Sequence, residues 1–247
     1  MELNNNFIYI MTGKTIAAIG VIILPQLSKH IYLKKKHKIL QIQNKALELS
    51  MFLSLPASVA LLIGSEEIIS ALFGYGSFGE DAVYNSAKAL YYFGLGLPAF
   101  ALIKVFSTFF FANNDTKTPF YISLFAVILN IIISIYYFQK IGFIIIPIAT
   151  TVSSWFNSIM LFIYLKNRNL FQFNNIFMVK FLKIIFASIM MGIFFKYLII
   201  NFENQLDYNY YFKSFYLILS VLLGLVFYLL ISLVIKAFNY KDLQLKY

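Results

Sequence analysis

The residues best able to do chemistry in this sequence are polar side chains that stand inside long apolar runs. The first is Lys104, which lies in the apolar run that precedes the polar turn Asn113–Thr118. An ammonium at bilayer depth is costly, so it is a candidate for contact with an anionic group in a bundle interior or a water-filled cavity. The long side chain could equally reach a membrane face. Both interpretations of Lys104 stay open.

Two amides and two hydroxyls form the second group of candidates. Asn130 and Ser134 are four residues apart and share one face of a predicted helix. Thr150 and Asn157 lie in the next apolar run. Such groups either line a polar path for a substrate or join helices by hydrogen bonds, each worth about 0.6 kcal/mol on average. The second interpretation is favoured for Ser and Thr, and both stay open for Asn130 and Asn157.

The sequence shows no constellation for hydrolysis or phosphoryl transfer. Its acids lie in loops, apart from Glu48 at the start of an apolar run, and no pair of carboxylates shares a run, as acid–base work would need. There is no cysteine, and the two histidines, His30 and His37, lie beside a lysine cluster. We therefore expect no enzyme activity, no metal site and no cofactor.

The composition is that of an integral membrane protein. Hydrophobic residues make up 61% of the chain and charged residues 12%, whereas a soluble domain has about 45–50% and about 25%. The net charge is +10, and its cations lie between the apolar runs. Membrane orientation and anionic lipids explain that charge better than nucleic acid does, so the expected partners include membrane lipids and no nucleic acid.

The elements that must position these residues are apolar runs of about 20 residues, the length that crosses a hydrocarbon core of roughly 30 Å. The segment Ile68–Phe73 is too short to cross and predicts an interfacial helical turn. The fold class expected is all-α, a polytopic membrane helix bundle with about seven transmembrane helices. The predicted runs are Phe7–Leu27, Ala46–Gly64, Ala87–Ala112, Pro119–Phe138, Phe143–Leu165, Ile176–Ile200 and Phe212–Ile235.

The loops between these runs predict the orientation of the chain. The lysine-rich loop 28–45, the turn at Asp115–Lys117, the loop with Arg168 and the C-terminal tail fall on one side, which is richer in Lys and Arg than the other. That side is expected to be cytoplasmic. The N-terminus would then lie outside and the C-terminus inside. An outside N-terminus without a signal peptide points to a missing front part.

Several stretches resemble the MurJ (MviN) family of lipid II flippases, part of the multidrug/oligosaccharidyl-lipid/polysaccharide exporter superfamily. The resemblance covers about Gly20 to Phe171, and the last two runs fit by hydropathy. The motif positions expected to have structural roles are Pro25, Ser28, Asp115, Lys117 and Pro119. The matching pieces are Gly20–Lys29, Leu55–Pro56, Leu72–Phe78, Ala89–Leu90, Lys104–Pro119, Asn130 and Gly142–Thr151.

The resemblance implies an architecture and a function. Family members have two six-helix lobes around a central cationic cavity, plus two extra C-terminal helices. Residues 1–171 would be a partial second lobe with five helices, and residues 172–247 the two additional helices and a cytoplasmic tail. The chain would be part of a lipid II flippase, moving the lipid-linked peptidoglycan precursor from the inner to the outer leaflet of the bacterial cytoplasmic (inner) membrane. Lys104, Asn130 and Asn157 are the substrate-path candidates.

Two alternatives remain for the function. One is an exporter of another lipid-linked oligosaccharide in the same superfamily, and the other is a truncated, non-transporting membrane remnant. Departures from the family favour the second for this chain taken alone. Members carry a Tyr-Ala-Asp-Arg stretch where this chain has Asn4–Asn6, and the first lobe, which a separate chain would have to supply, has no counterpart here.

The resemblance also implies a cation site in which one of the family's ligands is replaced. Some members are thought to bind a cation with an Asn, an Asp four residues later and a Thr on the next helix. Asn130 and Thr150 match these positions, but Ser134 stands where the acid would be. The resemblance therefore implies a vestigial cation site at Asn130, Ser134 and Thr150.

Overall fold

The described part of this computed structural model is helical throughout. It comprises residues 15–237, with the backbone alone described for residues 15–22, and it contains no strand. The prediction of an all-α fold is confirmed. The long helices are α2 (Thr15–Tyr32), α3 (Lys36–Ile63), α5 (Glu80–Ala112), α6 (Lys117–Ile141), α7 (Ile145–Asn167), α8 (Asn175–Asn201) and α10 (Lys213–Val234), and the short ones are α4 (Ser65–Phe73), η1 (Gly142–Ile144) and α9 (Glu203–Leu206).

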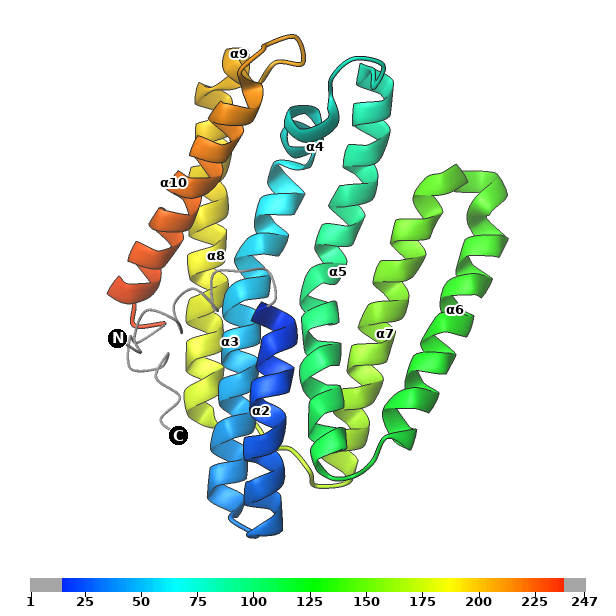
Figure 1. Ribbon diagram of the computed structural model, residues 1–247, viewed down its shortest axis with the longest axis vertical. Coiled ribbons are helices and arrows are strands. Elements are labelled where there is room, and N and C mark those ends of the chain that lie inside the picture. The colour runs from blue at the N-terminus through cyan, green and yellow to red at the C-terminus, as the bar shows by residue number, and fades with distance from the viewer. Residues whose placement is uncertain (1–14, 238–247) are drawn as a thin grey trace.

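Five helical stretches among the described residues are long and apolar enough to cross a membrane. One of them, Lys117–Asn167, holds both α6 and α7, which η1 joins. These two helices lie side by side and run in opposite directions (Figure 1), so the stretch crosses twice. The chain reverses at Gly142, whose φ of +74° suits glycine. α2 is not among the five, and the first part of the run predicted at Phe7–Leu27 lies outside the described residues.

The long helices form a layer with α2 on one of its faces. Figure 1 shows the order α10, α8, α3, α5, α7, α6 across the layer, and α2 stands in front of α3. The turns α2–α3, α5–α6 and α7–α8 lie at one end of the molecule, which we call the lysine end. α4, η1 and α9 lie at the other end, which we call the α4 end. α4 is the short helix that the sequence predicted as interfacial.

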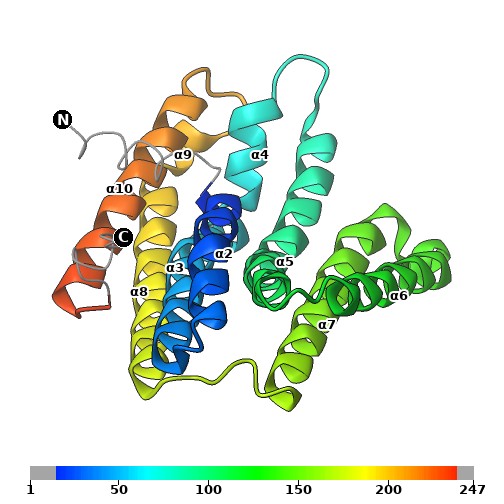
Figure 2. The ribbon, with the colours of Figure 1, turned by 60° about the horizontal axis from the view of Figure 1, so that its bottom comes forward.

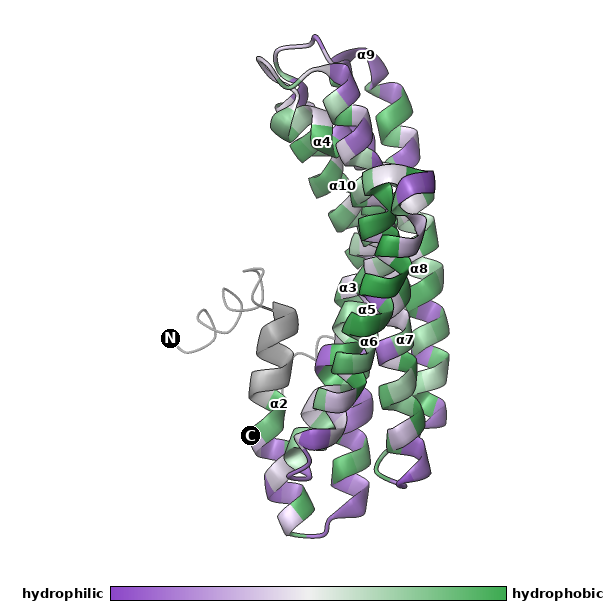
Figure 3. Cartoon of the chain, turned by 90° about the vertical axis from the view of Figure 1, so that its right-hand side faces the viewer, coloured by the Kyte–Doolittle hydropathy of each residue, from purple (hydrophilic) through white to green (hydrophobic). Residues whose placement is uncertain are grey.

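Two apolar clusters hold the layer together. One joins α2, α3, α5 and α7 around Phe109, Phe110 and Leu161. The other joins α3, α4, α8 and α10 around Ile184, Phe195 and Leu217. Figure 3 shows hydrophobic residues concentrated along the middle of the helices and hydrophilic residues at the two ends. This banded distribution is what a helix bundle in a bilayer requires.

Two prolines inside helices create contacts between neighbouring helices. Proline has no N–H, so it leaves the carbonyl four residues earlier without its helical donor. Pro98 in α5 frees the carbonyl of Gly94, which accepts a hydrogen bond from Ser58 Oγ of α3 at 2.7 Å. In the same way Pro56 in α3 frees the carbonyl of Phe52, which accepts from the hydroxyl of Tyr228 in α10 at 2.8 Å.

Helix α5 also packs closely on its neighbours through small residues. A Cβ added at Gly94 would lie 3.0 Å from Leu61 Cβ of α3. One added at Gly96 would lie 2.9 Å from Thr151 Oγ1 of α7, a hydroxyl that donates to the Tyr92 carbonyl of α5 at 2.6 Å. Both α3 and α7 therefore pack closely against α5 and are hydrogen-bonded to it.

Candidate functional site

The family-like turn between α5 and α6 is a structural cap. Asp115 accepts hydrogen bonds from the backbone N–H of Thr118 at 2.9 Å and from its hydroxyl at 2.7 Å, so its carboxylate holds the first turn of α6. The same carboxylate forms an ion pair with Arg168 just after α7. Lys117 is exposed, whereas Pro119 is buried in the first turn of α6, where a missing N–H costs little.

The electrostatics of Asp115 follow from these partners. Partial burial alone would raise the pKa of this carboxyl. The hydrogen bonds from Thr118 and the charge of Arg168 outweigh burial and hold the pKa below its ordinary value of 3.8. The carboxylate is therefore charged at neutral pH and ties the turn to the end of α7.

The earlier motif residues lie in the last turns of α2. Pro25 is exposed inside this helix, and Ser28 is half-buried one turn later. The structure thus places all five motif positions at the lysine-end half of the bundle, within α2, the α5–α6 turn or the first turn of α6.

Lys104 lies near the lysine end of α5 and is exposed. The helix has 33 residues, which corresponds to about 50 Å. A hydrocarbon core of about 30 Å therefore leaves about 20 Å of α5 to project at its two ends. Lys104 is about 12 Å from Ala112 along the helix, so if α5 is centred on the membrane it lies close to the edge of the hydrocarbon. The ammonium is outside the packed bundle, at a depth where a charge is tolerated.

Asn130 joins the two helices of the hairpin α6–α7. Its Nδ2 donates to Thr150 Oγ1 at 3.1 Å and to Ser153 Oγ at 3.3 Å. Thr150 in turn donates to the carbonyl of Ile146 at 2.8 Å. The hydroxyl of Ser134 is buried and has no hydrogen-bond partner among the described residues.

These contacts do not fit a bound sodium ion. Neither α6 nor α7 contains an Asp or a Glu, so the residues offer only neutral oxygens. The amide nitrogen of Asn130 faces Thr150, whereas a cation would need the amide oxygen there. Asn130 and Thr150 form an interhelical contact rather than a charged cage, and Ser134 takes no part in it.

Asn157 is buried between the same two helices. Its Nδ2 donates to Ser123 Oγ of α6 at 3.3 Å, and its Oδ1 is buried with no hydrogen-bond partner among the described residues. The three substrate-path candidates therefore do not form one cluster. Lys104 is on the surface of α5, whereas Asn130 and Asn157 point between α6 and α7.

Sequence reasoning missed a caged lysine at the α4 end. Lys213, the first residue of α10, is 1% exposed. Its Nζ donates to the carbonyls of Gly74 at 2.6 Å and Tyr208 at 2.7 Å, and lies 4.5 Å from the ring centroids of Tyr75 and Tyr208. Two carbonyls and two aromatic faces thus surround the ammonium. The run of tyrosines just before this lysine is the signal that could have found it.

A second charged contact ties α8 to α3 at the lysine end. The Glu48 carboxylate is buried and lies 3.0 Å from the ammonium groups of Lys45 and Lys180. Asn44 adds neutral hydrogen bonds to the chain just before α8, since its Nδ2 donates to the Gln172 carbonyl at 3.0 Å and its Oδ1 accepts from Asn174 N at 3.0 Å. Glu48, the acid at the start of the run predicted at Ala46–Gly64, is therefore paired with Lys180 of α8.

Comparison with known proteins identifies the family. Residues 6–217 match the family model described as Lipid II flippase MurJ. The chain belongs to the MurJ family. The match reaches into α10, so the similarity extends further than the stretch Gly20 to Phe171 that carried the resemblance in the sequence.

Individual MurJ relatives agree with the family match. A probable lipid II flippase MurJ of Rhizobium tropici is 37% identical over 151 residues, which is 61% of this chain and 28% of the relative. One from Thermotoga maritima is 34% identical over 187 residues, 76% of this chain and 36% of the relative. The lipid II flippase MurJ of Burkholderia cenocepacia is 28% identical over 186 residues, which is 75% of this chain and 36% of the relative. The chain thus spans about a third of the length of these relatives.

A solved structure confirms the fold. It is titled as a lipid II flippase MurJ in an inward closed conformation, and it superposes with a TM-score of 0.70 at 24% identity, covering 91% of this chain and 43% of that chain. The helix arrangement of the described residues is therefore that of part of a MurJ protein. The apolar helices and the MurJ relatives together make this a multi-pass membrane protein.

Proposed function

We propose that this chain is the C-terminal part of a lipid II flippase of the bacterial cytoplasmic membrane. The family match over residues 6–217 is the observation that carries the proposal. In it, residues 1–171 form a partial second lobe and residues 172–247 the additional C-terminal helices and tail. The lysine end faces the cytoplasm, because its turns carry the excess of Lys and Arg.

The proposed transport requires a first lobe in addition to residues 1–247. With both lobes present, rocking of one against the other would expose a site between them alternately to each side of the membrane. A cationic path lowers the cost of carrying a pyrophosphate-linked headgroup across hydrocarbon, while the lipid tail stays in the bilayer.

Lys104 is the proposed substrate-path residue of this chain. Its ammonium is exposed on α5 near the cytoplasmic edge of the hydrocarbon, where a headgroup would enter. Asn130 and Asn157, by contrast, are occupied by contacts between α6 and α7, so we assign them the role of holding the hairpin together.

A chimera tests the function. This chain would replace the matching C-terminal segment of the Burkholderia cenocepacia relative, and lipid II movement would be followed in proteoliposomes. We expect transport by the chimera and a loss of about tenfold on Lys104→Ala, the ratio that corresponds to about 1.4 kcal/mol. Lys117→Ala, an exposed lysine at the same end, is the matched control and should transport normally.

Two results would contradict these assignments separately. A chimera that inserts and folds but moves no lipid II would refute the flippase proposal. A chimera that transports equally well with Lys104→Ala and with Lys117→Ala would leave the flippase proposal standing and remove Lys104 from the path.

A further inference from the structure

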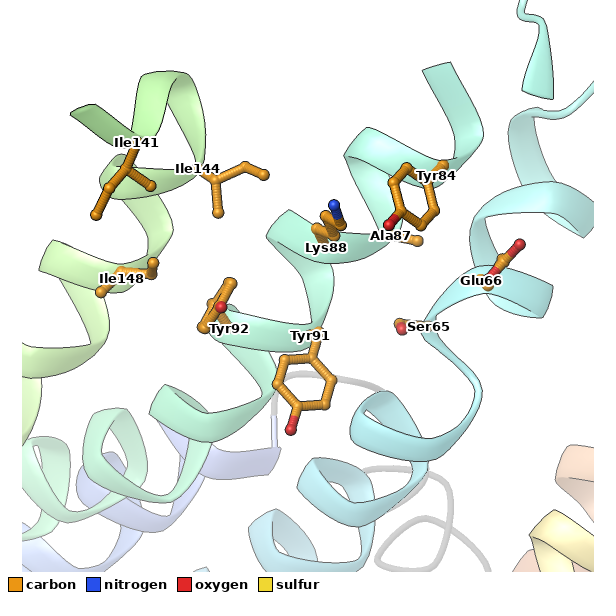
Figure 4. Close-up of a pocket in the computed structure, with 10 residues that line it drawn as sticks. All are labelled: Ser65, Glu66, Tyr84, Ala87, Lys88, Tyr91, Tyr92, Ile141, Ile144 and Ile148. Atoms are coloured by element: carbon orange, nitrogen blue, oxygen red, sulfur yellow. The ribbon is translucent and has the colours of Figure 1, made fainter. Parts of the chain in front are cut away.

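A cavity of about 420 Å³ opens at the α4 end between α4, α5 and the hairpin α6–α7 (Figure 4). Its lining divides into two halves of different chemistry. The α4–α5 half is polar and aromatic, and the hairpin half consists of isoleucines. The lining residues are Ser65, Glu66, Tyr84, Ala87, Lys88, Tyr91 and Tyr92 on the first side, and Ile141, Ile144 and Ile148 on the second.

The polar half holds one cation and one anion that are not paired with each other. Lys88 is half-buried, and its ammonium lies 3.9 Å from the centroid of the Tyr84 ring. Glu66 comes from α4 and is exposed. Within residues 15–237 neither charge belongs to an ion pair. Figure 4 shows Lys88 on α5 and Glu66 on α4, with Ser65 below Glu66 and Tyr91 below Lys88.

The depth of the cavity matches the headgroup level of a bilayer. Lys88 lies about 12 Å along α5 from its first residue, Glu80. If the 33-residue helix is centred on the membrane, about 10 Å projects at each end. Lys88 then sits at the border of hydrocarbon and headgroups, with tyrosines beside it as is usual at that level.

The face of the cavity separates it from the proposed transport path. Lys88 and Lys104 are sixteen residues apart on α5, which at 3.6 residues per turn is a rotation of about 160°. The two lysines therefore project from nearly opposite faces of the helix and from opposite ends of it. A ligand at Lys88 would be bound away from a substrate that passes Lys104.

We propose that this cavity binds the headgroup of a resident zwitterionic phospholipid. The phosphate lies at Lys88 and Tyr84, the headgroup ammonium at Glu66, and the glycerol and first acyl carbons against the isoleucines of the hairpin. A zwitterionic headgroup uses both unpaired charges at once, whereas an anionic lipid would pair with Lys88 and leave Glu66 without a counter-charge. The proposal concerns a bound lipid and is independent of the flippase assignment.

Native mass spectrometry of the purified full chain tests the proposal. The protein in detergent would be titrated with phosphatidylethanolamine or with phosphatidylglycerol. We expect tighter binding of phosphatidylethanolamine, and a weakening of that binding by about fivefold on Lys88→Met and on Glu66→Gln, the ratio for one solvent-accessible ion pair. Glu66→Gln should leave phosphatidylglycerol binding unchanged or improved.

Two further variants keep the result interpretable. Lys140→Met is the matched control, because Lys140 also lies over a tyrosine ring, that of Tyr136, at the same end but outside the cavity. Ile144→Trp fills the cavity from the hairpin side without touching either charge, so it should block phosphatidylethanolamine even if Lys88→Met fails to fold. Equal effects of Lys140→Met and Lys88→Met, equal binding of the two lipids, or full binding by Ile144→Trp would each overturn the proposal.

Discussion

The two helix pairs at the edges of the layer are attached to its centre by different means. Buried charges join the C-terminal pair α8–α10 to the rest of the layer at both ends. Glu48 of α3 pairs with α8 at the lysine end, and Lys213 of α10 donates to the carbonyl of Gly74, just after α4, at the other. The hairpin α6–α7 is held mainly by α5 through neutral hydrogen bonds such as that of Thr151. In α6 only Pro119, Ile122 and Ala126 are buried, whereas α7 has ten buried residues. In the described chain, then, buried charges attach the C-terminal pair to the centre, whereas the hairpin is attached through α7, and α6 leaves an apolar face that can meet another surface.

The largest effect is expected from Lys213→Met. The change leaves the carbonyls of Gly74 and Tyr208 without their charged donor, which costs about 3 kcal/mol. Denaturant-induced unfolding in mixed micelles measures the loss. Lys140→Met, at the same end on α6, is the control and should change the free energy of unfolding little. Equal destabilisation by the two variants would contradict the claim that a buried charge holds the pair α8–α10 more firmly than the hairpin α6–α7 is held.

The second largest effect is expected from Glu48→Gln, which should lower the free energy of unfolding by about 2 kcal/mol. The substitution keeps the size of the side chain but removes the negative charge between Lys45 and Lys180. Hydrogen exchange should rise in the first turns of α8 and stay unchanged in α6 and α7. If exchange rises throughout the bundle, Glu48 supports the whole fold and is not a specific attachment of the C-terminal pair.

Tyr228→Phe should cost about 1 kcal/mol, since the Phe52 carbonyl freed by Pro56 loses its donor. The double variant with Pro56→Ala gives position 56 an N–H that can serve the same carbonyl. We therefore expect the second change to recover most of the loss in a double-mutant cycle. Strict additivity of the two effects would show that the proline and the tyrosine are not coupled.

Asn130→Leu should cost about 0.6 kcal/mol, the average for one hydrogen bond between membrane helices. Addition of sodium should not change the melting temperature of the wild-type chain, because the hairpin offers no carboxylate. A rise in melting temperature with sodium, but not with choline at equal ionic strength, would mean that Asn130 and Thr150 do hold a cation.

The smallest effect is expected at Asp115, where water screens the contact with Arg168. The pKa of this carboxyl is lowered by folding, so its contribution to stability is fully present above the ordinary value of 3.8 and is lost as pH falls through the lower folded-state value. Wild type and Asp115→Asn should thus differ in unfolding free energy at neutral pH and converge once the pH falls below the lowered folded-state pKa. A constant difference across that range would contradict the assignment.

The sequence predicted the helices better than it predicted their contacts. Apolar length and turn residues located the interfacial helix α4 and the long helices from α3 onward, because membrane spans are set by local composition. Side-chain roles depended on packing that no periodicity reveals. Asn157 resembles a path residue in the sequence, yet it is buried against Ser123. Lys213 stands at the start of the predicted run Phe212–Ile235, yet its ammonium donates to the carbonyl of Gly74, from a turn 139 positions earlier.

The prolines of α3 and α5 also determine how this bundle can deform. Ser58 lies six residues after Phe52, so less than two turns of α3 both receive the hydroxyl of α10 and supply a hydroxyl to α5. A bend at either proline must then stretch a bond to the adjacent helix. Bending of α3 is therefore coupled to the positions of α10 and α5 through these two hydrogen bonds.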